Sequence, residues 1–155
     1  MREFASPAAF AAFLARVRDA IPRAEHEGLH AGARIVQEEI KAGMGSAQGA
    51  IHGLPEWPDL AERTQAERAR KGYDPNGMLV RTGELRASVQ YTVGEGHASI
   101  GSDDPIAVYQ EFGTPDAAHP IPPRPFVGSG LFRAADKAVD AMVKPVIAAL
   151  EGKIR

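Results

Sequence analysis

The stretch VQYTVGEGHASI, residues 89–100, decides the fold class of this chain. Val89, Tyr91 and Val93 alternate with polar residues, which is the pattern of a half-buried strand. The sequence GEG at 94–96 predicts a turn, and the alternation that resumes after it predicts the returning strand. An isolated hairpin is barely stable in water. We therefore expect this one to join other strands or to lie on helices.

Helical spacing dominates the chain before the hairpin. Ser6 followed by Pro7 predicts a helix start, because serine caps helices and proline fits their first turn. The first apolar stripe comprises Phe10, Phe13, Leu14, Val17 and Ile21. Pro22 predicts that this helix is interrupted or restarted. A second stripe, ending near Gly43, comprises Leu29, Ala33, Val36 and Ile40.

Helical patterns return after the hairpin. Asp104-Pro105 predicts the start of a short helix, and Gly113 predicts its end. The apolar side of that helix comprises Ile106, Tyr109 and Phe112. Ser129 predicts the cap of a final helix, which Pro145 is expected to kink or to end early. Its predicted apolar stripe comprises Leu131, Ala135, Ala138, Met142, Val146 and Leu150.

Three connecting segments complete one domain spanning residues 1–155. Residues 44–59 form a long loop around Trp57, of a length that is usually functional or mobile. Residues 60–71 are charged and predict a short solvated helix or a segment that orders only against a partner. Residues 114–126 are rich in proline and predict a stiff arm. The expected fold is α+β, with N-terminal helices and a kinked C-terminal helix packed on a small antiparallel sheet.

Composition excludes several classes of function. The chain of 155 residues contains no cysteine, which excludes disulfides and thiolate chemistry and suits a reducing cytosol. No apolar run approaches the roughly 20 residues that span a bilayer, so no membrane location is expected. The net charge is −2 with acids and bases interspersed, so no specific nucleic-acid partner is expected. No cofactor is expected either.

One motif suggests catalysis. His26 and His30 with Glu27 match the pattern H-E-x-x-H, in which two histidines on a helix hold zinc and the glutamate activates water. Gly28 weakens the helix that would hold the ligands, and a place at the edge of the core also explains His26. A zinc metalloprotease is therefore kept only as a remote alternative.

Several short motifs, taken in order, carry a resemblance. They are WPDL at 57–60, TGEL at 82–85 with Ser88, EFGT at 111–114 after Tyr109, and PPRPF at 122–126. In this order they resemble the tail-completion and virion-morphogenesis proteins of tailed bacteriophages, including the HK97 gp10-like group and the related Mu and P2 types. The resemblance covers roughly residues 57 to 150, and it carries over no catalytic residues.

The resemblance implies an α+β fold and a structural role at the head–tail junction of the virion, after assembly in the host cytoplasm. There such proteins form or complete the ring that joins the tail tube to the capsid. The implied partners are further copies of the chain and other phage neck and tail proteins. The alternative role is that of a tail terminator, which caps the tail tube.

The proline-rich arm is the expected contact between subunits. A segment preset by prolines loses little entropy on docking, and arginine and aromatic residues are favoured at interface hot spots. The candidate interface residues are Trp57, Pro122, Pro123, Arg124, Pro125 and Phe126. The other interpretation is that Phe126 covers the core of its own subunit and Arg124 caps a local carboxylate.

Overall fold

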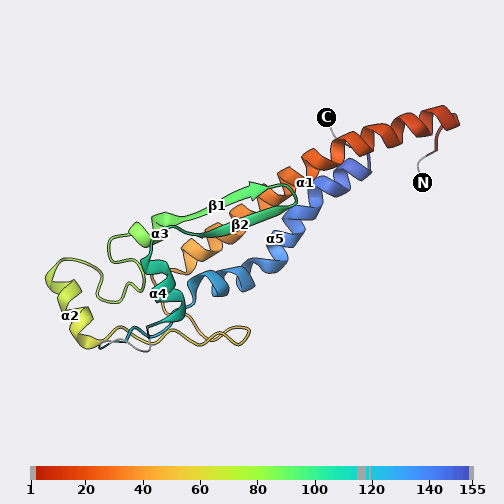
Figure 1. Ribbon diagram of the computed structural model, residues 1–155. Helices are drawn as coiled ribbons and strands as arrows, with labels where there is room; N and C mark the ends of the chain where they lie inside the picture. The colour runs from red at the N-terminus through yellow and green to blue at the C-terminus, as the bar shows by residue number, and fades with distance from the viewer. Residues whose placement is uncertain (1–2, 115–117, 119, 154–155) are drawn as a thin grey trace.

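The computed structural model describes residues 3–114, 118 and 120–153. Its elements are α1 (Pro7–Gly43), α2 (Glu62–Arg70), α3 (Glu84–Ser88), β1 (Val89–Gly94), β2 (His97–Ser102), α4 (Ile106–Phe112) and α5 (Phe126–Leu150). Figure 1 shows α1 and α5 side by side, with the β1–β2 hairpin lying along them. The α+β prediction is confirmed. Within the described residues, no helix is both long and apolar enough to cross a membrane.

The hairpin forms as its alternation predicts. β1 and β2 are antiparallel, with Val89 opposite Ser102 and Gly94 opposite His97. Val89 is fully buried against the helices, and its carbonyl accepts a 2.8 Å hydrogen bond from the Gln37 side chain of α1. In the described part of the chain the sheet has only these strands, so it packs on the helices rather than joining a larger sheet.

The prediction that Pro22 divides the N-terminal helix is wrong, because α1 runs unbroken through this residue. Ser6 caps it as expected, accepting a 3.1 Å bond from the amide of Ala9. Proline removes one helical hydrogen bond. Pro22 is exposed, so the carbonyl of Arg18, four residues earlier, can bond to water instead. The early end predicted at Pro145 is also wrong, since α5 continues to Leu150.

The packing of α1 on α5 depends on small residues. A Cβ added at Gly28 would meet the main-chain oxygen of Met142, and one at Gly130 would come within 2.8 Å of the Ile40 Cα. These contacts show that the two helices run antiparallel. The predicted stripe on α5 is therefore partly wrong. Its buried side comprises Phe126, Ser129, Gly130, Ala134, Ala138 and Ala149, whereas Leu131 and Leu150 are exposed.

The antiparallel packing leaves the start of α1 uncovered. Met142 lies against Gly28, and α5 ends eight residues after Met142, at Leu150. Because both helices rise 1.5 Å per residue, α5 reaches only to about residue 20 of α1. The preceding residues 7–19, which we call the free end of α1, extend about 20 Å further, as Figure 1 shows at the N-terminus.

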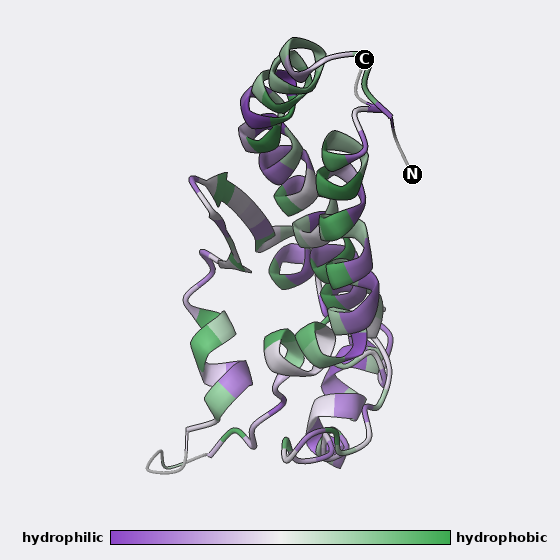
Figure 2. Ribbon diagram, turned by 90° about the vertical axis from the view of Figure 1, so that its right-hand side faces the viewer, coloured by the Kyte–Doolittle hydropathy of each residue, from purple (hydrophilic) through white to green (hydrophobic). Residues whose placement is uncertain are grey.

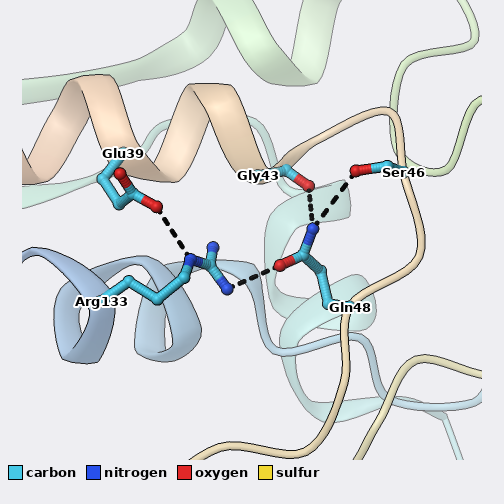
Figure 3. Close-up of polar contacts among 5 residues, drawn as sticks. All are labelled: Glu39, Gly43, Ser46, Gln48 and Arg133. Carbon is cyan, nitrogen blue, oxygen red and sulfur yellow. Dashed lines mark hydrogen bonds and ion pairs between the residues drawn. The ribbon is translucent and has the colours of Figure 1, made fainter.

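Polar contacts fix the predicted long loop to the two main helices (Figure 3). Arg133 of α5 donates to Glu39 of α1 at 2.9 Å and to Gln48 of the loop at 2.6 Å. Gln48 in turn donates to the carbonyl of Gly43, the last residue of α1, at 2.9 Å. Further along, His52 stacks on Phe132 of α5 with ring centroids 4.7 Å apart. The loop is therefore held against α5.

Candidate functional site

The arm and the start of α5 are held by one carboxylate. Glu111, near the end of α4, accepts hydrogen bonds from the amides of Phe126 (2.8 Å), Val127 (3.0 Å) and Gly128 (3.1 Å). These amides lie in the first turn of α5, where backbone N–H groups have no acceptor within the helix. The helix dipole also favours a negative charge at this end. The prediction that Ser129 caps this helix is wrong. Ser129 lies inside α5, 1% exposed, and its hydroxyl has no hydrogen-bond partner in the described ranges of the chain.

Both ends of the arm are fixed by local bonds. Gly113 has φ 77°, and a Cβ there would come within 2.8 Å of the Ile121 carbonyl oxygen, so only glycine suits this position. The Thr114 amide donates to that carbonyl at 2.9 Å, and the Ile121 amide donates to the Thr114 hydroxyl at 2.8 Å. Residues 115–117 and 119 of the predicted arm lie outside the described residues.

Arg124 joins the arm to the segment that follows Trp57. Its guanidinium donates to the Pro58 carbonyl from Nε (3.2 Å) and Nη2 (2.8 Å), and to the Asp59 carbonyl at 3.1 Å. Burial, and after it the positive charge of Arg68, lower the pKa of Arg124, while Asp59 acts in the opposite direction. Arginine stays protonated in proteins. The site therefore holds a buried cation that is bonded to neutral carbonyl groups.

A cavity of about 690 Å³ opens beside Arg124. Its walls come from α2, from the turn that precedes α3, from α4 and from residues 120–124 of the arm. The apolar part of the lining includes Leu60, Leu79, Leu85, Ile106 and Ile121. The cavity thus lies where several of the sequence motifs, WPDL, TGEL and PPRPF, come together.

The structure divides the predicted interface residues into two groups. Pro122 and Pro123 are exposed. The buried group comprises Trp57 (4% exposed), Arg124 (5%), Pro125 and Phe126 (1%). Phe126 occupies the core of its own chain, and Arg124 caps carbonyls instead of the expected carboxylate. Contact between the arm and another subunit stays a prediction, and of its candidate residues Pro122 and Pro123 are the exposed ones.

The two histidines of the H-E-x-x-H pattern lie together on the exposed side of α1. Their ring centroids are 4.7 Å apart, and His30 also contacts Tyr91 of β1 at 5.8 Å. Glu27 accepts a 2.9 Å bond from Arg23. Among the residues that the structure describes, no group of three or more potential metal ligands occurs. Gly28 within the motif is explained by its contact with α5.

Sequence reasoning missed Glu111 as the cap of α5 and Arg68 as a buried residue of the cavity. Arg68 is 8% exposed and donates from Nη1 to the Gly77 carbonyl at 2.5 Å. The available signal for Glu111 was its place in the EFGT motif, where a charged residue directly precedes Phe112 near the end of a short helix.

Replacing Glu111 with glutamine is expected to lower the free energy of unfolding by about 2 kcal/mol, as hydrogen bonds to a charged acceptor are lost or weakened. The glutamine side chain keeps one acceptor oxygen, but an NH₂ donor replaces the second oxygen and faces the α5 amides, which are donors themselves. Urea denaturation followed by circular dichroism measures the change. The control is Glu95→Gln, which removes the same charge from the exposed hairpin turn. Equal stability of both variants would contradict the capping role.

Comparison with known proteins identifies the chain at the level of its family. Neither the curated proteins nor the solved structures gave a match. The model of the phage virion morphogenesis family matches residues 14–145, which is most of the chain. The chain therefore belongs to the phage virion morphogenesis family.

Proposed function

We propose that this chain is a structural protein of the head–tail junction, where it forms or completes the ring that joins the tail tube to the capsid. It works by fitting against other subunits and performs no catalysis. Its partners are further copies of itself and other neck and tail proteins, which it meets in the host cytoplasm during assembly. Membership of the phage virion morphogenesis family supports this assignment.

The observation that carries the proposal is the exposure of apolar side chains at both ends of the molecule. At the free end of α1, Phe10 is 45% and Leu14 48% exposed. On α4, Phe112 is 74% and Val108 58% exposed. Apolar positions also lie outward along α5, namely Val139, Val143, Ile147 and Leu150. Contiguous exposed apolar surface marks interaction sites in soluble proteins.

The position of these surfaces suits a ring. A closed ring of identical subunits needs two different patches on each subunit, which contact each other between neighbours. The free end of α1 and helix α4 lie far apart in Figure 1, toward opposite ends of the molecule. In Figure 2 both ends carry apolar (green) residues on exposed helices. We assign one patch to each end.

Inactivating the gene in its phage or prophage is expected to abolish infectious particles while heads and tails still form. Electron microscopy of lysates should show filled heads and unattached tails of normal length, and the gene supplied in trans should restore joining. Tails of abnormal length would instead support the alternative, a tail terminator that caps the tail tube. Stoichiometric zinc, with proteolysis lost in His30→Ala, would support the remote alternative. Normal joined particles would contradict both structural roles.

A further inference from the structure

The cavity beside the arm contains two buried guanidinium groups. Arg68 is 8% and Arg124 5% exposed, and both line the cavity. Among the described residues, their hydrogen bonds go only to main-chain carbonyls, those of Gly77, Pro58 and Asp59. The Nε of Arg68 is fully buried and has no acceptor within the part of the chain that the structure describes. A buried charge is expensive unless a counter-charge is close.

Neither guanidinium forms an ion pair with a carboxylate in the described part of the chain. Each carries its charge permanently, and Arg68 is close enough to Arg124 to lower the pKa of Arg124, second in effect to burial. Two like charges in a partly desolvated site repel each other. An anion bound in the cavity beside them would offset the repulsion between the two charges.

Burial lowers the pKa of Arg124 and Asp59 acts to raise it, but none of the carboxylates that line the cavity forms an ion pair with either guanidinium in the described part of the chain. Asp104 accepts a 2.9 Å bond from the Ile106 amide, which starts α4. Glu84 accepts a 2.9 Å bond from the Thr82 hydroxyl. Asp59 is exposed, and its carboxylate forms no ion pair among the described residues.

Two further arginines lie at the same cavity. Arg63 and Arg81 are exposed, and neither forms an ion pair with a described carboxylate. Arg81 instead lies over the ring of Tyr73, 5.7 Å from its centroid. With the leucine and isoleucine side chains of the lining, the cavity combines an apolar wall with buried and exposed cations. Such a surface fits an acidic side chain that has an apolar neighbour.

We propose that this cavity binds an aspartate or glutamate side chain, flanked by an apolar residue, on another protein subunit of the particle. That the partner is another subunit rests on the proposed function. That the bound group is a carboxylate rests only on the residues that line the cavity. A nucleic-acid backbone fits less well, because the buried cations are recessed and the chain has a net charge of −2. Asp59 and Glu84 at the lining would also repel a run of phosphates.

The test uses the whole protein and two blocked dipeptides, N-acetyl-Glu-Leu-amide and N-acetyl-Gln-Leu-amide. Arginine Nε–H resonances of the ¹⁵N-labelled protein are followed at constant ionic strength. We expect the glutamate dipeptide to shift the Arg68 and Arg124 resonances saturably, with at least about tenfold tighter binding than the glutamine dipeptide. Inorganic phosphate, titrated in the same way, is expected to bind more weakly than the glutamate dipeptide.

Two variants locate the binding. Arg68→Lys keeps the charge but loses the planar fork, and should weaken binding of the glutamate dipeptide at least about fivefold. Arg86→Gln removes an exposed arginine of α3 that does not line the cavity, and should leave binding unchanged. Circular dichroism checks the fold of each variant. If Arg68→Lys does not fold, the two dipeptides on the unaltered protein still decide the question.

Three outcomes would overturn the proposal. The first is equal response to both dipeptides, or none. The second is tighter binding of phosphate than of the glutamate dipeptide, which would indicate a phosphate site. The third is a shift of the Arg68 resonance in ligand-free Asp116→Asn, since Asp116, which lies outside the described residues, would then be the occupant. None of these outcomes bears on the joining of heads to tails, so the carboxylate site and the ring are tested independently.

Discussion

Replacing Gly28 with leucine is expected to lower the free energy of unfolding by about 3 kcal/mol, the upper end of the usual range for overpacked cores. Gly28 is buried on α1, and any Cβ there meets the main-chain oxygen of Met142 on α5. The obstacle is backbone, so a rotamer change cannot relieve it, and the helices must separate. Leucine favours a helix over glycine by about 0.8–1 kcal/mol. A net loss of stability in Gly28→Leu would therefore result from disturbed helix packing and not from helix propensity.

Urea and thermal denaturation measure this effect. In a domain of this size a loss of 1 kcal/mol lowers the melting temperature by about 2–4 °C, so a drop of roughly 6–12 °C is expected. Gly49→Ala is the control, because a Cβ at Gly49 meets no atom within 4 Å. It should change stability by less than about 0.5 kcal/mol. If Gly28→Leu matched this control, close helix packing at Gly28 would not stabilise the fold.

Elements whose signals are local could be predicted from the sequence. The hairpin follows from the alternation around Tyr91 and from the turn at 94–96. The bounds of α4 follow from Asp104, which bonds the first helical amide, and from Gly113, which takes a positive φ. Each of these signals acts within a few residues, so the rest of the fold does not need to be known.

The faces of the long helices could not be predicted in this way. Apolar periodicity favours large residues such as Leu131 and Leu150 as the buried side of α5, yet these are 48% and 56% exposed. The choice is made by the partner helix, where Gly28 lets the main chain of α5 approach at Met142 and Gly32 leaves room for the Met142 side chain. Large apolar residues of α5 such as Leu131 and Leu150 therefore stay exposed to solvent or to other subunits.

The arm shows the same division between local and tertiary signals. Its proline content favours Arg124 and Phe126 as contacts to another subunit, but both are buried within their own chain, because the arm closes over the core. The cap of α5 is Glu111, 15 residues before Phe126 in sequence. Single-sequence reasoning places a cap next to its helix, which is why it selected Ser129. The conformation that brings Glu111 to α5 depends on the turn at Gly113.

Replacing either Leu14 or Phe112 with glutamate is expected to abolish self-association and leave the fold intact. Leu14 lies at the free end of α1 and Phe112 on α4, and they are 48% and 74% exposed. A charge placed in the centre of an apolar contact must be desolvated without a partner. Hot-spot changes of this kind cost at least about 2 kcal/mol, more than tenfold in affinity. Sedimentation velocity over a concentration series measures the change.

Mixing the two variants tests the geometry of the ring. If the free end of α1 contacts α4 of the next subunit, Phe112→Glu still presents an intact free end and Leu14→Glu an intact α4. An equimolar mixture should then form dimers and nothing larger, although each variant alone stays monomeric. Ala12→Glu is the control, because residue 12 is exposed and lies about 200° around α1 from residue 14, so it should assemble normally. Monomers in the mixture would contradict a direct contact between these two patches, since a head-to-tail interface must be restored when each partner supplies its unaltered half.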